Sequence, residues 1–464
     1  MTTRTLSTIC RTTLAVLGMM TLPTQAGTVE DHATGDVDLS SNPWFIGSAI
    51  GGGTGRVLID DGETHDLRIN QNVILGLIPD TTNKTKGVLT ITGIGSTWNG
   101  PTMVSSAVYL KHNWSSLNVL DGGRMNTSSL YIAGEFNTPT PANQAAMVHI
   151  SGFDAQSGIG SQIRVSGWML MGTSGYFADT GNAMLSISDG GSLEAFRLAI
   201  GSTSYLGIQI DGKSSLKVDH VSNTTGFIYL MADGNVLPGT DYAPITSVVT
   251  SLSDIPVRAF GGEWNASTGK FTVLTSQTGE AGTRIGFDTN ERAIITGSNS
   301  NPMLTVSVRR DPGDVGGHSL TEITATPLTL AQISQVQATA QSLDLPPAVL
   351  GGWYHEITSN RATMFSLNVG PDQDVDDLVF WEHRQTSLDV WDWLPFMPEV
   401  YWYNADGSLS FVCEGTWSSS YHHVDAFAIT GKGEVGGGGE VPEPASLSLL
   451  SLGIAALILR RRNV

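Results

Sequence analysis

One short phrase recurs through the first half of the chain and limits the folds that are open to it. In each copy two β-forming residues flank a single residue, and a turn rich in aspartate and glycine follows. The copies lie at residues 57–62, 88–93, 117–123, 148–152, 185–191 and 208–212. A second phrase that ends in glycine follows several of them, at residues 73–76, 130–134 and 198–201.

The phrase has the alternating period of a β-strand with one buried face. Each copy is too short to bury that face alone, whereas stacked passages of chain would join their apolar faces into one core. Glycine and Asp-Gly pairs supply the positive-φ corners between strands. The sequence therefore predicts an all-β protein in which residues 27–275 form a parallel β-helix, right-handed like parallel crossovers in general. Irregular spacing of the copies keeps an antiparallel sandwich as the alternative.

The first residues have the order of a secretory signal peptide. Arg4 and Arg11 precede an apolar stretch over residues 14–22, and small residues lead to Ala26. We predict a signal peptide over residues 1–26, with a buried first helix as the alternative.

The last residues hold three parts in a fixed order, after a glycine-rich linker over residues 434–440. An apolar run over residues 445–459 separates two short motifs. These motifs are Val441, Pro442, Glu443 and Pro444 before the run, and Arg460, Arg461 and Arg462 after it. As a helix the run reaches roughly 22 Å, short of the roughly 30 Å of a bilayer core, so we expect only transient membrane contact. The arginines would hold its end on the cytoplasmic side.

This order closely resembles the PEP-CTERM sorting signal of Gram-negative bacteria, which makes residues 441–464 a sorting tail. The resemblance implies that an exosortase-type processing enzyme cuts near the Pro-Glu-Pro motif. It also implies an exported protein at the cell surface or in the extracellular matrix. A plain C-terminal membrane anchor is the alternative.

The repeat carries a second resemblance. Residues 89–98, with their Gly-Ser-x-Trp sequence, resemble the opening of the PEP-CTERM-associated and autotransporter-passenger repeat, and the later phrases match its other parts. The resemblance covers residues 40–275 and implies a passenger-like parallel β-helix. Residues 261–273 resemble the closing part of such passengers, where a cap protects the end of the sheets.

Charge and cysteine content narrow the function. The net charge of −19 disfavours contact with phosphate backbones, so we expect no nucleic-acid partner. Cys10 falls in the predicted signal peptide and leaves Cys413 alone, so no internal disulfide is expected. Cys413 is predicted to be a buried small apolar residue.

The second half loses the repeat but keeps β-like patterns. We predict a β segment with a helical connector over residues 276–345 and a C-terminal β-sandwich over residues 346–433. A capping box of Thr329 and Gln332 starts the helix, with Leu330, Ile333 and Val336 on one face, and Pro346 ends it. Residues 400–403 and 409–413 are expected to form a hairpin.

The block also holds two sets of candidate ligand-binding residues. The acidic set is Asp372, Asp374, Asp376 and Asp377. Carboxylates in one loop can hold Ca²⁺, which prefers several oxygen ligands, but a solvated acidic loop is the alternative. The aromatic set is Trp391, Trp393 and Trp402, whose rings could stack on sugars, with core packing as the alternative. No cofactor is required by the sequence, and calcium is the one candidate ion.

Three functions are consistent with these patterns. The first is a non-enzymatic surface or matrix protein, structural or adhesive, that associates with extracellular polysaccharide. The second is a secreted polysaccharide lyase or hydrolase on the β-helix, which needs charged groups that converge on one face. The third is a calcium-dependent carbohydrate-binding module over residues 351–431. The chain lacks the Gly-x-Ser-x-Gly, HExxH and P-loop motifs, so the sequence favours the first function.

Overall fold

The computed structural model describes residues 33–432, with gaps at 41, 48–53, 68–70, 77–85, 101–105, 112–114, 134–145, 174–180, 223, 233–235, 288–291, 298–302, 309–320, 358–362, 388 and 414–423. The described residues form an all-β protein with one α-helix among them. The predicted signal peptide, glycine-rich linker and sorting tail lie outside the described residues.

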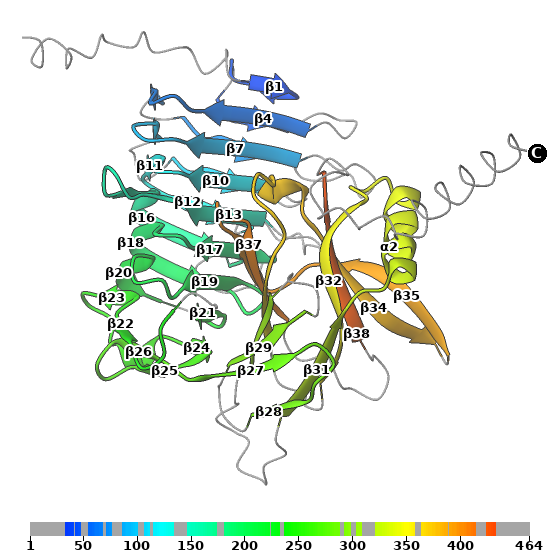
Figure 1. The fold of residues 1–464 in the computed structure, drawn as a ribbon. Helices are drawn as coiled ribbons and strands as arrows, with labels where there is room; N and C mark the ends of the chain where they lie inside the picture. Colours follow the sequence, from blue (N-terminus) through cyan, green and yellow to red (C-terminus); the bar gives the residue numbers. More distant parts are fainter. Residues whose placement is uncertain are drawn as a thin grey trace, which may run out of the picture.

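Residues 33–260 build two large sheets that the chain visits in alternation, and a small antiparallel pair, β14 (Phe153–Asp154) and β15 (Ile159–Gly160). The first sheet holds, in spatial order, β1 (Ala33–Gly35), β4 (Thr54–Ile59), β7 (Lys86–Thr92), β10 (Ser116–Leu120), β13 (Ala146–Ser151), β17 (Ala183–Ile187), β19 (Tyr205–Gln209), β21 (Phe227–Met231) and β24 (Val257–Phe260). From β4 to β24 every neighbouring pair is parallel. The antiparallel alternative therefore does not hold for these strands, which are stacked one above another in Figure 1.

The second sheet receives the chain between its passages through the first. Its strands are β2 (Val37–Asp38), β3 (Trp44–Ile46), β5 (Thr64–Asp66), β6 (Val73–Leu75), β8 (Thr97–Asn99), β9 (Val108–Leu110), β11 (Arg124–Thr127), β12 (Leu130–Ile132), β16 (Gln162–Met171), β18 (Ser192–Ile200), β20 (Ser215–Val221) and β23 (Ile245–Ser247). The long β16 pairs in parallel with β11 along its first half and with β12 along its second. It thereby joins two parallel ladders into one sheet.

The core between the two sheets consists of columns of aliphatic side chains. In the first sheet Leu89 pairs with Leu117, and Leu117 pairs with Val148, so equivalent positions of successive passages lie over one another. The neighbouring column holds Ile91 and Ile150, which are both 0 % exposed. Each fully buried side chain of this size contributes about 1.5–3 kcal/mol, so the columns stabilise the stacked strands.

The corners after the first-sheet strands explain the aspartate and glycine of the phrase. Both residues have positive φ, as predicted, at Asp61–Gly62, Asp121–Gly122 and Asp189–Gly190. A serine from the next passage accepts a hydrogen bond from the corner glycine, in Gly62 to Ser96 (3.1 Å), Gly122 to Ser161 (3.0 Å) and Gly190 to Ser214 (3.1 Å). Degenerate copies of the repeat therefore keep this serine, although only the first has the Gly-Ser-x-Trp sequence.

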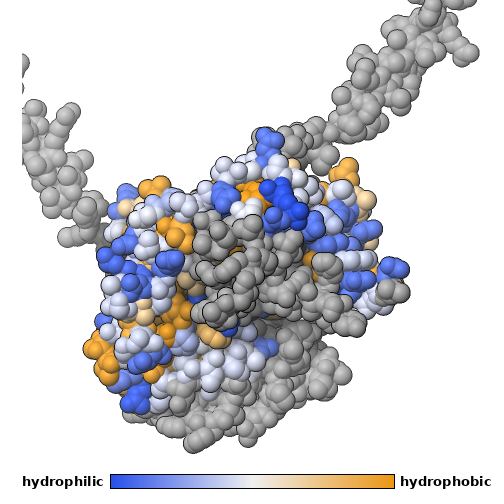
Figure 2. Space-filling view, turned by 90° about the horizontal axis from the view of Figure 1, so that it is seen from below, coloured by the Kyte–Doolittle hydropathy of each residue, from blue (hydrophilic) through white to orange (hydrophobic). Residues whose placement is uncertain are grey.

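Antiparallel strands close both ends of the stacked sheets. At the first end β1 pairs antiparallel with β4, and β2 pairs antiparallel with β3. At the other end, next to β24, a small antiparallel sheet is formed by β22 (Asp241–Tyr242), β25 (Gly262–Asn265) and β26 (Lys270–Val273). Its Phe271 and Val273 are buried in the core of the first half. Figure 2, a view from below, shows both hydrophobic and hydrophilic residues on the lower face of the molecule.

Residues 276–432 build two further sheets of six strands each. One holds β27 (Ser276–Glu280), β29 (Arg292–Thr296), β30 (Met303–Val308), β33 (Thr363–Asn368), β37 (Ser408–Cys413) and β36 (Val400–Tyr403). The other holds β28 (Ile285–Phe287), β31 (Thr321–Pro327), β32 (Ala348–Ile357), β38 (Val424–Gly431), β34 (Val379–Ser387) and β35 (Val390–Phe396). Each sheet takes strands from both sides of residue 346, so the predicted boundary there does not separate two sheets.

Phenylalanines fill the space between these two sheets. The rings of Phe365 and Phe427 lie 4.7 Å apart, and those of Phe380 and Phe411 lie 5.3 Å apart. Strands β36 and β37 form the predicted hairpin, and Cys413 at its end is buried, as expected.

The helix α2 (Leu330–Ser342) covers the outer side of the second of these sheets (Figure 1). Its predicted capping box is present, because Thr329 and Gln332 exchange hydrogen bonds through their side chains and backbone amides. The predicted apolar face is partly wrong: Leu330 is 66 % exposed, while Val336 and Ala340 are buried. The buried face contacts Trp381 and Trp393 and therefore lies one turn further along than the sequence pattern indicates.

The described chain has a first half, residues 33–273, and a second half, residues 276–432. The two halves share a hydrophobic core. The apolar side chains that point outward from the first sheet, namely Met147, Met184, Tyr229, Met231 and Phe260, belong to the same cluster as the phenylalanines of the second half. Strands predicted to be buried on one face only are therefore buried on both. The reason is tertiary, since the second half covers the outer face of the first sheet.

Candidate binding cleft

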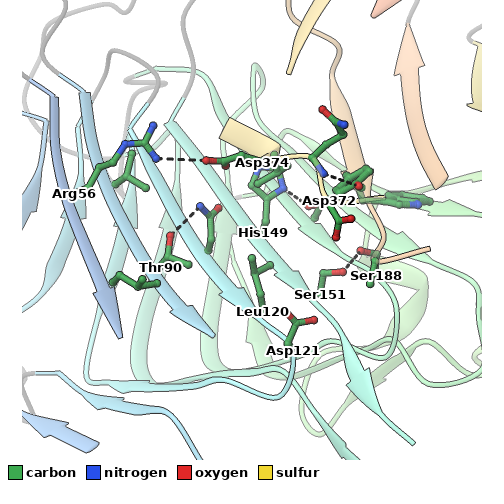
Figure 3. Close-up of a pocket in the computed structure, with 18 of the residues that line it drawn as sticks. Arg56, Thr90, Leu120, Asp121, His149, Ser151, Ser188, Asp372 and Asp374 are labelled. Carbon is green, nitrogen blue, oxygen red and sulfur yellow. Dashed lines mark hydrogen bonds and ion pairs between the residues drawn. The ribbon is translucent and has the colours of Figure 1, made fainter. Parts of the chain in front are cut away.

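A cleft of about 580 Å³ lies where the second half leaves part of the first sheet uncovered. Its floor is the outer face of β4, β7, β10, β13 and β17 (Figure 3). Its roof is the loop that carries Asp372 and Asp374, together with Trp402, Tyr403 and Ala405 at the hairpin of β36 and β37. Neither half alone encloses this space.

A column of polar side chains runs across the floor. Thr90, Asn118, His149 and Ser186 occupy equivalent positions on four neighbouring strands. Strands in a sheet are about 4.8 Å apart, so the column presents hydrogen-bonding groups at that interval. Asn118 Nδ2 lies 3.5 Å from Thr90 Oγ1, and His149 Nδ1 lies 2.8 Å from Ser186 Oγ.

A second polar row follows beside the first. Ser188 Oγ donates to Ser151 Oγ at 3.1 Å, and both residues line the cleft. Leu120 is in register with Ser151, and the exposed Asp121 follows it in a left-handed corner. Asp121 accepts a hydrogen bond of 3.2 Å from Thr92 Oγ1. The floor is thus rich in hydroxyl groups, with an amide, an imidazole and a carboxylate.

His149 is a neutral group at pH 7. Burial lowers the pKa of its imidazole from 6.5 to about 4, against a weaker opposing effect of the nearby Asp376 carboxylate. The side chain is 2 % exposed. Nδ1 has its contact with Ser186, while Nε2 has no hydrogen-bond partner among the described residues. The neutral ring therefore keeps one nitrogen, Nε2, whose capacity to donate or accept a hydrogen bond is unused among the described residues.

The acidic loop forms the roof and contacts the first half. It contains the short 3₁₀ helix η4 (Val375–Asp377), whose preceding residue Asp374 accepts a hydrogen bond from the Asp376 amide. Asp374 pairs with Arg56 at 3.5 Å, and Asp377 pairs with Arg56 at 3.8 Å and with Lys432 at 2.7 Å. Asp376 accepts from Asn118 Nδ2 at 2.9 Å. The loop fixes the second half on the first sheet.

These contacts bear on the predicted calcium site. Asp374, Asp376 and Asp377 turn toward separate partners, and Asp372 is exposed at the edge of the loop. Within the part of the chain that the structure describes, no three His, Cys, Asp or Glu residues gather as a metal-binding group. These carboxylates are neighbours in the sequence, and they join parts of the protein that are far apart in the sequence.

The structure contradicts most of the predicted aromatic platform. Trp393 and Trp402 are 5 % and 1 % exposed, so neither can present a ring face to a sugar. Trp393 packs under α2, and Trp402 belongs to the core shared by the two halves. Trp391 is half-buried, and its ring stacks on His383 at 5.3 Å with an angle of 20° between the planes. Crowded tryptophans here reflect core packing, the alternative that the sequence left open.

Further acidic groups lie near the floor. Burial raises the pKa of Asp189 to about 6, and the carboxylates of Asp211, Asp406 and Asp121 add to the effect. Asp406 belongs to the hairpin of β36 and β37, while the other three come from the corners of the first half. Like charges from both halves therefore face one another at this side of the molecule.

Sequence reasoning missed Asn118, His149 and Ser186. Alternation assigns them to a solvent face, where polar residues need no explanation. One signal was present: the outward positions of β13, β17 and β21 also hold Met147, Met184 and Tyr229, which are too apolar for an uncovered sheet. Such a pattern indicates a second layer over the strands.

The comparisons with known proteins concern the end of the chain. Residues 440–462 match the family model of the PEP-CTERM protein-sorting motif, a range that holds all seven predicted motif residues. The motif marks an exported bacterial protein that an exosortase processes and that is sorted to the cell surface. No curated protein and no solved structure gives a match. Among the described residues, no helix has the length and apolar character needed to cross a bilayer.

Proposed function

We propose that this exported protein is a non-enzymatic structural or adhesive component of the surface or extracellular matrix of a Gram-negative bacterium, and that its cleft binds extracellular polysaccharide. The observation that carries the proposal is the polar floor of the cleft. Thr90, Asn118, His149 and Ser186 offer hydrogen-bonding groups at the spacing of the strands, opposite a roof supplied by the other half. A chain of sugar hydroxyls is the extracellular ligand that such a row matches.

The first half is the stalk of this proposal. We interpret residues 27–275 as the passenger-like β-helix that the repeat resembles, with the right-handed path that parallel crossovers prefer. The parallel, in-register pairing of β4 to β24 supports this interpretation. Stacked passages make a rigid face, which suits a binding row because its groups are held in place before the ligand arrives.

The contacts of Asp374 give no support to catalysis by this residue. A glycosidase needs a carboxyl pair on either side of the scissile bond. Burial raises the pKa of the Asp374 carboxyl, yet this group pairs with Arg56 and not with a second acid. The acidic loop therefore acts as a joint between the halves, and the enzyme hypothesis gains no support from it.

The test is a binding measurement with the exported protein on an array of extracellular oligosaccharides. We expect saturable binding to at least one class of glycan, with no shortening of the bound chains. Thr90→Trp, which fills the cleft from its floor, should lower the affinity at least about tenfold, or about 1.4 kcal/mol. Thr97→Trp is the matched control, since Thr97 is another half-buried threonine of the same passage but lies on the second sheet.

Three outcomes would overturn the proposal. Silence of the whole array would remove glycan binding, and an equal loss in both tryptophan variants would move it away from the cleft. Release of shorter oligosaccharides would favour the polysaccharide-active enzyme.

A further inference from the structure

Two carboxylates that line the cleft form no ion pair with a basic side chain of the described residues. Asp121 lies at the edge of the floor and Asp372 at the edge of the roof, and both are exposed residues that line the space (Figure 3). No described basic side chain forms an ion pair with either of them, whereas the third aspartate of the cleft, Asp374, is paired with Arg56. Among the described residues, the floor and the roof of the cleft therefore each carry one aspartate whose charge is not paired.

Two buried polar atoms of residues that line the same cleft also lack hydrogen-bond partners among the described residues. His149 Nε2 and Asn118 Oδ1 make no hydrogen bond among the described residues, and both side chains are 2 % exposed. A buried polar atom without a partner has lost its hydration and gained nothing in return, so a ligand that satisfies it gains affinity. Figure 3 shows His149 rising from the floor toward the loop that carries Asp372 and Asp374.

We propose that the cleft selects a polysaccharide of amino sugars whose amino groups are free. Its ammonium groups would pair with Asp121 and Asp372, while His149 Nε2 and Asn118 Oδ1 would hydrogen-bond to ring hydroxyls or to an ammonium. Uronate polymers are excluded because their carboxylates would meet these aspartates and the field of a chain with net charge −19. The inference rests on the proposed function and names the class of glycan that the same cleft takes.

The experiment compares three hexasaccharides by calorimetry with the exported protein: glucosamine, N-acetylglucosamine and galacturonate oligomers. We expect the glucosamine hexamer to bind roughly tenfold more tightly than its acetylated form, the size of two partly exposed ion pairs, and galacturonate not to bind. Asp121→Asn and Asp372→Asn, combined, should abolish the difference in affinity between the first two hexamers. Asparagine tolerates the positive φ of both positions, so the backbone is preserved.

A charge-matched control separates the site from general attraction. Asp254→Asn removes the same kind of charge at an exposed position on the short helix η3 (Leu252–Asp254), away from the cleft, and should leave all affinities unchanged. Three results would each overturn the inference. They are equal affinities for the glucosamine and N-acetylglucosamine hexamers, a higher affinity for the galacturonate hexamer, and an effect of Asp254→Asn equal to that of a cleft variant. Equal binding would still leave glycan binding in place, whereas silence with every glycan would remove the proposed function itself.

Discussion

Asn118 and Asp376 are 258 positions apart in the chain, and the Asn118 amide donates a hydrogen bond of 2.9 Å to Asp376 Oδ2. Lys86 Nζ adds a bond of 3.0 Å to the Asp376 carbonyl oxygen. Asn118 is buried, whereas the pair of Arg56 with Asp374 is about half exposed. Exposed ion pairs contribute about 0–1 kcal/mol each, so the buried bond is the stronger polar contact between the halves.

Asp376→Ala is expected to lower the free energy of unfolding by about 1–3 kcal/mol, because the buried Asn118 amide then lacks its strongest acceptor. Asp376→Asn keeps an acceptor oxygen and should lose less. Urea denaturation measures both variants, with Asp254→Ala on the exposed η3 helix as the control, expected within about 0.5 kcal/mol of the parent. Equal losses in Asp376→Ala and the control would show that the contact is unimportant.

Gly207→Ala should destabilise the junction of the halves. A Cβ atom at this position of β19 would lie 2.5 Å from Val400 Cγ2 and 3.0 Å from Met231 Cε. Forcing a methyl group into a packed core costs about 1–3 kcal/mol. Gly286→Ala is the matched strand control, because its Cβ would meet only Glu322 Cγ at 3.7 Å. Thermal melting should separate the two variants, and similar melting temperatures would contradict the close packing of β36 on β19.

His149→Gln should change the pH dependence of stability. The folded pKa of His149, about 4, lies below its value of 6.5 in the unfolded chain. Between these values the unfolded state binds the extra proton, so stability falls as the pH is lowered from about 6.5 to about 4. Over this pH range the free energy of unfolding of the parent should fall by up to about 3 kcal/mol more than that of the His149→Gln variant. Urea titrations at pH 7.5, 6 and 5 measure it, and parallel pH profiles for parent and variant would refute a buried neutral histidine.

Ile59→Ala and Leu58→Ala test the shared interior of the stacked strands. These neighbours on β4 point to opposite faces, with Ile59 0 % and Leu58 40 % exposed. Removing Ile59 leaves a cavity in the aliphatic column and should cost about 2–5 kcal/mol. Leu58→Ala should cost less than about 1 kcal/mol. A similar loss for both residues would contradict the assignment of the two faces.

Local patterns predicted much of the fold. Alternation located the strands of the first sheet, Asp-Gly pairs located its positive-φ corners, and Thr329 with Gln332 located the start of the helix. These features depend on residues that are close together in the chain, so their physical cause is visible in the sequence.

The roles of polar and aromatic residues were harder to predict. A run of aspartates has the composition of a calcium loop, and a run of tryptophans that of a sugar platform. In the folded chain Asp374, Asp376 and Asp377 contact Arg56, Asn118 and Lys432, and Trp393 and Trp402 are buried. A side chain's environment depends on partners that can lie hundreds of positions away, and a single sequence does not display them.

The sequence by itself determined the sorting tail and the β-class of the chain, because both are written in the order and alternation of neighbouring residues. Only the tertiary structure decided which part of the outward face of the first sheet is covered. The second half packs on Met147, Met184 and Tyr229 and leaves a space above Thr90 and Asn118. The hydrophobic effect is not directional, so burial of apolar surface explains why the two halves associate but not in which orientation. The shapes of the two folded surfaces determine where the cleft is left open.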